Sequence, residues 1–116
     1  MAVLITGGTG FVGSFVARAL LEIGEIPVLL DIGGPGDSLR DFIGRFVYVK
    51  GDITDFDILF QTIQSHGIDR VIHLAALLSF GCERDPRKAI EVNVQGTLKV
   101  LEASRITGIK NSTERL

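Results

Sequence analysis

Four glycines lie close together near the start of the chain, in the segment Thr6-Gly7-Gly8-Thr9-Gly10-Phe11-Val12-Gly13. The segment follows a short apolar run, residues 2–5, and precedes residues whose apolar positions recur at helical spacing. Glycines between a strand and a helix allow a tight turn, and they let the backbone approach a phosphate whose charge meets free N–H groups of the helix. The segment therefore predicts the pyrophosphate turn of a dinucleotide site. The alternative is a glycine-rich turn without a ligand.

A carboxylate, Asp31, stands at the end of a second predicted strand, 18 residues after Gly13. An acidic residue about 20 residues after such a turn is expected to bind a ribose 2′-hydroxyl, which favours NAD. NADP remains the alternative cofactor, because folding of the loop can bring Arg40 close to a 2′-phosphate. The alternative for Asp31 itself is a solvated strand end or the acceptor for a turn.

The elements that position these residues alternate along the chain. Strands are predicted at residues 2–6, 27–31, 45–50 and 70–76, and helices at 11–23, 37–43, 55–66 and 86–107. We expect Thr54 to cap the third helix, and the residues of the first helix that face the sheet to be Phe11, Phe15, Ala19, Leu20 and Ile23. This alternation predicts an α/β, Rossmann-type three-layer fold with a parallel sheet of about four strands in the order 3-2-1-4.

The end of the chain carries no strand pattern. Residues 1–108 are predicted to form one dinucleotide-binding half domain, and residues 109–116 a polar tail. The sheet is then expected to stop before a fifth strand, partway through a larger fold. An open edge at the fourth strand would favour a homo-oligomer or association with another chain.

Composition excludes several classes of protein. The chain has 116 residues, a net charge of −2 and scattered basic residues, so we expect no nucleic-acid partner. No apolar run approaches the roughly 20 residues that span a bilayer, so no membrane partner is expected. The single Cys82 cannot form an internal disulfide, no leader pattern opens the chain, and Cys82 has no neighbours that suggest a metal site. A cytoplasmic location without a bound metal is therefore predicted.

Four motifs follow one another in a specific order. They are residues 6–13, Gly51-Asp52-Ile53-Thr54-Asp55, His73-Leu74-Ala75-Ala76 and Asn93-Val94-Gln95-Gly96-Thr97. Together they make the chain resemble the extended short-chain dehydrogenase/reductases, also called the NAD-dependent epimerase/dehydratase family. The resemblance covers most of the chain, from Thr6 to Thr97.

The resemblance implies a cofactor-binding role for twelve residues. They are Gly7, Gly10, Phe11, Val12 and Gly13 at the pyrophosphate, Asp31 at the ribose, Asp52 and Ile53 at the adenine, Leu74, Ala75 and Ala76 on the nicotinamide side, and Asn93 approaching from the last helix. Each has an alternative role, since Asp52 can start a turn, the alanines can be core and Asn93 can bond to nearby backbone. His73 lies within a buried strand pattern and is interpreted as a core histidine.

The catalytic residues of that family are not assigned in this chain. The family uses a Tyr and a Lys four residues later, which the resemblance places after Leu116, whereas the only tyrosine here, Tyr48, has Asp52 four residues later. We therefore expect an NAD(P)-binding N-terminal part that is inactive alone. The alternative is a non-catalytic dinucleotide-sensing or interaction module. An ordinary flavodoxin-like domain is disfavoured, because the glycine turn and Asp31 form a paired dinucleotide signature.

Overall fold

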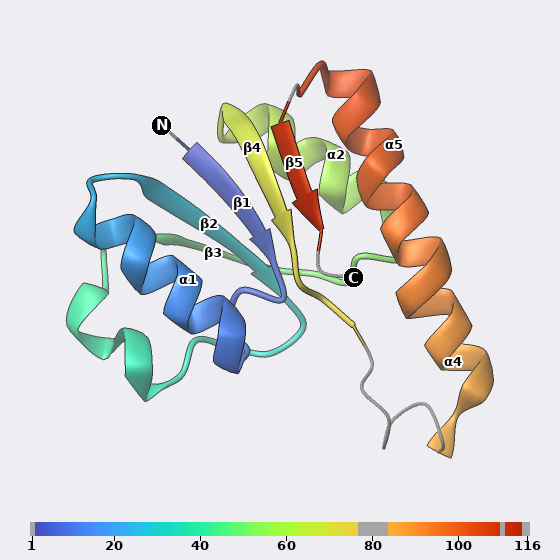
Figure 1. Cartoon of the computed structure of the whole chain (residues 1–116), viewed down its shortest axis with the longest axis horizontal. Helices are drawn as coiled ribbons and strands as arrows, with labels where there is room; N and C mark the ends of the chain where they lie inside the picture. Colours follow the sequence, from blue (N-terminus) through green and yellow to red (C-terminus); the bar gives the residue numbers. More distant parts are fainter. Residues whose placement is uncertain (1, 77–83, 110, 115–116) are drawn as a thin grey trace.

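The computed structural model describes residues 2–76, 84–109 and 111–114, and in these residues the strands form one parallel sheet (Figure 1). The strands are β1 (Ala2–Thr6), β2 (Ile26–Asp31), β3 (Val47–Lys50), β4 (Ile68–His73) and β5 (Asn111–Glu114), in the order β3-β2-β1-β4-β5. The α-helices are α1 (Phe11–Glu22), α2 (Phe56–Ser65), α4 (Pro86–Ile90) and α5 (Thr97–Thr107), together with a 3₁₀-helix, η1 (Asp37–Phe42), and a π-helix, η2 (Glu91–Gly96). The predicted order 3-2-1-4 of the first four strands is confirmed.

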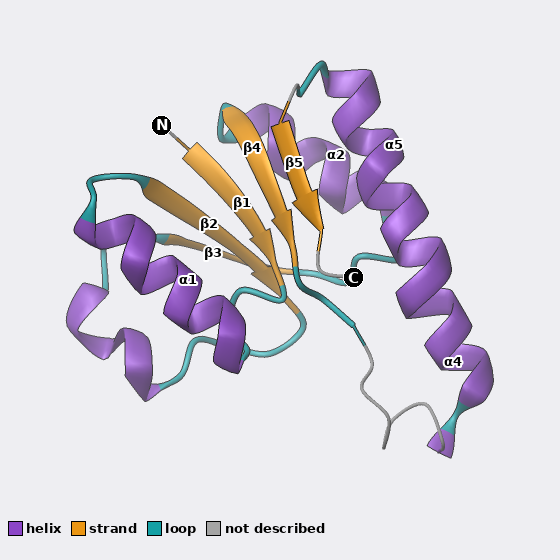
Figure 2. Cartoon of the chain, in the orientation of Figure 1, coloured by secondary structure: helices purple, strands orange, loops and turns teal. Residues whose placement is uncertain are grey.

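Helices cover both faces of the sheet (Figure 2). On one face, Val3 and Ile5 of β1 pack with Ala17 of α1, whereas Leu4 between them packs with the core under α2 and α5. Successive side chains of a strand point to opposite faces, so a strand buried on both sides needs apolar residues at every position. This explains the continuous apolar runs of the sequence.

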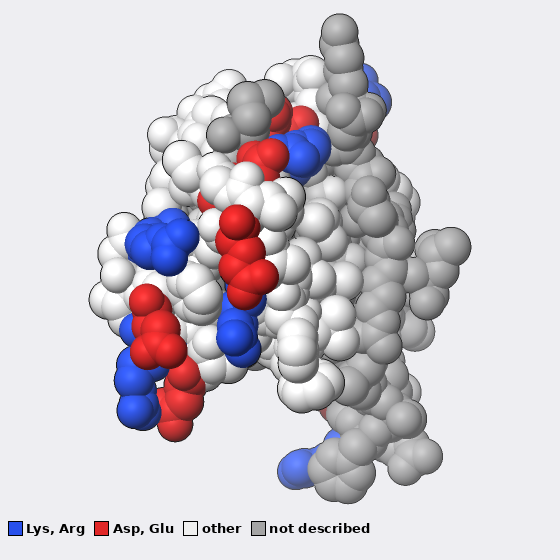
Figure 3. Space-filling model, turned by 60° about the vertical axis from the view of Figure 1, so that its left-hand side comes forward, with Lys and Arg blue, Asp and Glu red and all other residues white. Residues whose placement is uncertain are grey.

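The surface shows no large field of one charge on the face turned to the reader in Figure 3, where acidic and basic side chains lie next to one another. This mixed pattern agrees with the small net charge of −2. Within the part of the chain that the structure describes, no helix is both long and apolar enough to cross a membrane.

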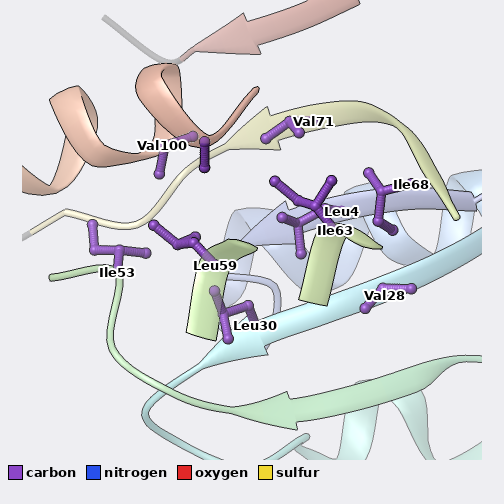
Figure 4. Packing of buried hydrophobic residues seen from close by; sticks show 10 residues of the cluster. Leu4, Val28, Leu30, Ile53, Leu59, Ile63, Ile68, Val71 and Val100 are labelled. Atoms are coloured by element: carbon purple, nitrogen blue, oxygen red, sulfur yellow. The ribbon is translucent and has the colours of Figure 1, made fainter. Parts of the chain in front are cut away.

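The larger core lies between the sheet and the helices α2 and α5 (Figure 4). Its buried residues are Leu4, Val28, Leu30, Ile53, Leu59, Ile63, Ile68, Val71, Val100 and Ala103. Each fully buried Leu, Ile or Val contributes about 1.5–3 kcal/mol relative to an exposed one. Because Ile53 belongs to the loop after β3 and Val100 to α5, this core holds that loop and that helix in place beside the sheet.

Helix α1 buries a different face from the predicted one. Phe11, Phe15 and Ile23 are 82%, 60% and 73% exposed, and the rings of Phe11 and Phe15 contact each other edge to face at 5.2 Å. The buried residues of the helix are Gly13, Ser14, Ala17 and Leu21. Of the predicted residues, Ala19 is also exposed, and only Leu20 packs, partly buried, against the smaller core. The rest of the prediction was wrong because the helix lies so close to the preceding turn and the sheet that mainly small residues fit between them.

The predicted polar tail contains a strand. Strand β5 pairs in parallel with β4, with Asn111 opposite Arg70 and Glu114 opposite His73. The main-chain hydrogen bonds that hold an edge strand do not require apolar side chains, so its polar sequence gave no strand pattern. The expectations of a sheet without a fifth strand and of an open edge at β4 are therefore both wrong.

Helix boundaries agree with the sequence in part. Asp55, not Thr54, caps α2, because its carboxylate accepts the N–H groups of Asp57 and Ile58. The helix predicted at 86–107 is divided by η2 into α4 and α5, and it ends as expected at Gly108, whose φ is +79°. Cys82 and most of the loop predicted at 77–85 lie outside the described residues.

Candidate functional site

A cavity of about 300 Å³ opens at the carboxyl ends of the strands. Open parallel sheets bind ligands at this edge. Residues that follow β1, β2, β3 and β4 surround the cavity, and helices α1, α4 and η2 complete it. Its lining consists of Gly7, Gly10, Phe11, Val12, Gly13, Leu30, Asp31, Ile32, Gly51, Asp52, Ile53, Leu74, Ala75, Ala76, Lys88 and Val92.

The glycine turn is fixed by backbone contacts on two sides. The N–H of Gly7 donates to the carbonyl of Leu30 at 2.8 Å, and the N–H of Gly10 donates to the carbonyl of Gly7 at 3.2 Å. Gly7 has a φ of +69°, and a Cβ there would lie 2.9 Å from the backbone nitrogen of Ala75. Only glycine combines this conformation with so close an approach of two chain segments.

The N-terminus of α1 points a set of backbone donors at the cavity. Gly10 is the N-cap, no side chain caps the helix, and the first turn contains no acidic residue. The first N–H groups of a helix have no partner within the helix, and the helix dipole makes this end positive. The N–H groups of Phe11 and Val12, which line the cavity, therefore suit an anionic group such as a pyrophosphate.

Asp31 is held by three donors of the chain. Its Oδ2 accepts the N–H of Thr9 at 3.2 Å and the hydroxyl of Thr9 at 2.7 Å, and its Oδ1 accepts the N–H of Ile32 at 2.8 Å. A carboxylate offers about four acceptor positions, so a fixed carboxylate with three donors keeps capacity for a further one. A ribose hydroxyl is such a donor.

The other end of the cavity combines a carboxylate with an apolar wall. Oδ1 of Asp52 accepts the N–H of Thr54 at 3.0 Å, and the ammonium of Lys88 lies 3.7 Å from Oδ2. Burial alone would raise the pKa of Asp52, but the hydrogen bonds from Thr54 and the charge of Lys88 outweigh it and hold this pKa below its ordinary value. An ionised acceptor beside Ile53 and Val92 suits the amino edge of a purine.

A buried hydrogen-bond network fixes the chain after β4. Thr97 donates its hydroxyl to the carbonyl of Asn93 at 2.8 Å and therefore accepts from Nε2 of His73 at 3.0 Å. In a neutral imidazole Nδ1 is then an acceptor, and the hydroxyl of Thr6 donates to it at 2.5 Å. Thr6 Oγ1 in turn accepts the N–H of Leu74 at 3.1 Å. His73 is 4% exposed, so it serves as a structural core histidine, as the sequence indicated.

The structure brings all but one of the predicted site residues into the cavity lining. The exception is Asn93, which lies in η2 outside that lining and whose carbonyl accepts the hydroxyl of Thr97. Sequence reasoning missed Leu30, Ile32, Gly51, Lys88 and Val92. Lys88 and Val92 are four residues apart on consecutive helical turns, a signal that becomes useful only once the helix face toward the sheet is known.

The structure also gives the position of Arg40 and of the side chains that could bind a metal. Arg40, considered for a 2′-phosphate, lies outside the cavity lining and forms an ion pair with Asp37 at 2.7 Å, with both side chains largely exposed. Among residues 2–76, 84–109 and 111–114, no three or more His, Cys, Asp and Glu side chains are grouped so that they could hold a metal ion.

Comparison with protein families gives one match over almost the whole chain. The model of the NAD dependent epimerase/dehydratase family matches residues 3–114. Among curated proteins, the chain is 39% identical over 116 residues to a UDP-glucose 4-epimerase of Neisseria gonorrhoeae, covering 94% of this chain and 34% of the relative. It is 34% identical to a UDP-glucose 4-epimerase of Klebsiella pneumoniae, covering 96% of this chain and 85% of that relative.

Solved structures agree with this match. The UDP-glucose-4-epimerase of Stenotrophomonas maltophila, crystallised with bound NAD and formylated UDP-arabinopyranose, superposes with a TM-score of 0.86 at 31% identity, over 98% of this chain and 36% of that one. The UDP-glucose 4-epimerase of Brucella ovis in complex with NAD gives a TM-score of 0.84 at 34% identity, over 97% and 34% of the two chains. The chain thus spans about a third of the length of most of these relatives.

Proposed function

The chain belongs to the NAD dependent epimerase/dehydratase family, and we propose that it binds NAD as the N-terminal cofactor-binding part of such a protein. The observation that carries the proposal is the convergence of three features in one cavity. These are the uncapped N-terminus of α1, the carboxylate of Asp31 with remaining acceptor capacity, and the ionised Asp52 beside an apolar wall.

Each part of the dinucleotide has a matching part of the cavity. The N–H groups of Phe11 and Val12 would hold the pyrophosphate, and Asp31 would accept the hydroxyls of the adenosine ribose. Asp52 and Ile53 would hold the adenine. The residues after β4, Leu74, Ala75 and Ala76, would lie along the nicotinamide half, where two small side chains leave room. Bound NAD supplies a hydride acceptor.

NAD fits the site better than NADP. A 2′-phosphate brings negative charge and acceptors to a place where Asp31 already presents a carboxylate. The nearest downstream arginine, Arg40, is paired with Asp37 and lies outside the cavity lining. A 2′-phosphate requires a nearby cation. Among the described residues that line the cavity, the only cation is Lys88, at the adenine end.

We further propose that the chain itself does not supply the acid–base catalyst. Proton transfer needs a group within hydrogen-bond reach of the substrate. The only tyrosine of these 116 residues, Tyr48, donates its hydroxyl to the carbonyl of Gly33 at 2.8 Å, and Asp52 rather than a lysine stands four residues later. The names of the relatives suggest a nucleotide sugar as the substrate class of the complete protein.

A second candidate is a dinucleotide-sensing or interaction module without a reaction of its own. It shares the binding step and differs from the first candidate in that bound NAD would undergo no turnover. Association through a free edge of β4 is no longer part of this candidate, because β5 occupies that edge. A nucleotide sugar that reduces NAD bound to this chain, followed by NADH fluorescence, would argue against both the module and the inactive half domain.

Calorimetric titration with NAD and NADP tests the binding proposal. We expect the chain to bind NAD more tightly than NADP, and Asp31→Ala to remove most of this preference. The matched control is Asp57→Ala, which removes an exposed carboxylate of α2 outside the cavity and should leave both affinities unchanged. A folded sample that binds neither dinucleotide would overturn the proposal.

A further inference from the structure

We propose that Tyr48 is a positioning residue that makes the site selective for NAD over NADP, by holding the carbonyl of Gly33 and thereby the carboxylate of Asp31. This inference rests on the proposed function, because it concerns the same cofactor site. It assigns a role to the one tyrosine of the chain, which lies in β3, outside the cavity lining.

Tyr48 connects a rigid strand to a loop that is rich in glycine. Its ring packs against the smaller core, which includes Leu29 and Leu39, and its hydroxyl donates to the carbonyl of Gly33 at 2.8 Å. The loop at residues 32–36 has the sequence Ile-Gly-Gly-Pro-Gly, and glycines give a free loop many backbone conformations. The bond from Tyr48 therefore fixes one conformation of the segment that directly follows Asp31.

Thr9 has a single hydroxyl proton and lies between Asp31 and Gly33. The Thr9 hydroxyl lies 2.7 Å from Oδ2 of Asp31 and 3.1 Å from the carbonyl of Gly33, so two acceptors compete for one proton. The proton goes to Asp31, because the carboxylate is the nearer acceptor and carries charge, while the Gly33 carbonyl has a donor in Tyr48. Without the Tyr48 hydroxyl, the loop at residues 32–36 would lose the bond that holds Gly33 beside Thr9, and Asp31, which accepts the N–H of Ile32 at the start of this loop, would be less firmly oriented.

This arrangement presents an acceptor to the expected ribose. The Asp31 carboxylate, which lines the cavity, suits hydroxyl groups, which donate, and opposes a phosphate, which brings acceptors and negative charge at neutral pH. As long as Tyr48 holds the loop, the chain cannot rearrange to bring other donors to a 2′-phosphate. A loop released from Tyr48 can do so, and selectivity should fall.

The test is calorimetric titration of four chains, unsubstituted, Tyr48→Phe, Asp31→Ala and the double variant, with NAD and with NADP. We expect Tyr48→Phe to weaken NAD binding about fivefold, as for the loss of one hydrogen bond, with NADP binding unchanged or tighter. In the Asp31→Ala background, the same substitution should change NAD affinity less than about twofold, because no carboxylate remains to be positioned. Thr62→Val is the control, since it removes a hydroxyl bonded to the carbonyl of Ile58 on α2.

The outcomes separate this inference from the proposed function. An unsubstituted, folded chain that binds no NAD overturns both. A chain that prefers NAD in an Asp31-dependent way, but whose Tyr48→Phe variant keeps the same ratio of NAD to NADP affinity, overturns only the role of Tyr48. An equal loss of both affinities in Tyr48→Phe, or an equal effect with and without Asp31, would also overturn it, since a merely structural role predicts these results.

Discussion

Replacement of Gly13 by alanine separates two physical effects that oppose each other. Gly13 lies in the first turn of α1 and is buried against the glycine turn. In an isolated helix, Gly→Ala is stabilising by about 1 kcal/mol, because alanine loses less backbone entropy. Propensity alone therefore predicts a more stable protein.

The packing around Gly13 predicts the opposite. A Cβ there would lie 2.2 Å from the carbonyl oxygen of Gly7 and 2.8 Å from Cα of Gly8, and both are backbone atoms. The clash can be relieved only by moving α1 away from the turn, and overpacking of this kind costs about 1–3 kcal/mol. With a clash this close, we expect the upper end, and a net loss of about 2 kcal/mol after the gain in propensity.

Thermal unfolding measures this difference directly. For a domain of this size, a loss of 2 kcal/mol lowers Tm by about 8 °C. Gly10→Ala is the matched control, because a Cβ there lies 3.4 Å from the Gly7 carbonyl oxygen and the φ of −74° suits alanine. This control should change stability by less than about 1 kcal/mol, while its methyl group at the pyrophosphate turn weakens NAD binding about tenfold.

The Tm of the Gly13→Ala variant can also refute the close packing of α1 on the glycine turn. A Gly13→Ala protein with an unchanged or higher Tm would show that α1 does not pack on the turn as closely as the structure indicates. The description of the glycine turn as a segment held in place by close backbone contacts would then be wrong.

Three further predictions concern other parts of the molecule. The hydrogen bond and charge of Arg70 lower the pKa of Glu25 below 4.5, so this pair stabilises the fold above that pH and loses its effect as the pH falls through the lowered pKa. The Tm difference between Glu25→Gln and the unsubstituted protein should therefore shrink from neutral to acidic pH; a constant difference would argue against the ion pair. Asp55→Ala should cost about 1 kcal/mol in urea unfolding, because it removes the cap of α2, and an unchanged midpoint would contradict this. Gly96→Ala should displace the flexible end of Ile53, which lies 2.6 Å from the added Cβ, and calorimetry should show weaker NAD binding with little loss of Tm; unchanged binding would count against Ile53 as a wall of the site.

The sequence predicts the site well where the signal is local. The glycine turn and Asp31 are recognisable because their spacing along one β-α-β unit follows directly from the geometry of that unit. Lys88 and Val92 were missed because they reach the cavity from a distant helix, and only the tertiary structure decides which side of that helix faces it.

Two fold errors have specific physical causes. Phe11 and Phe15 have the residue type and spacing of a core stripe, but close backbone packing at Gly13 decides which face of α1 is buried. The strand at 111–114 has polar residues, and an edge strand is stabilised by main-chain bonds that leave no apolar pattern. Neither cause can be read from hydrophobic periodicity.

The central claim is that the cavity at the carboxyl ends of the strands binds NAD, and an NMR titration of the ¹⁵N-labelled chain tests it most directly. The account predicts that NAD shifts the amide signals of Gly7 to Gly13, of Asp31 to Gly33, and of Asp52, Ile53, Leu74 and Ala75. The amide signals of the C-terminal end of α5, a helix that contributes no residue to the cavity lining, should not shift. Saturating NAD that leaves the signals of the glycine turn unchanged would contradict the account.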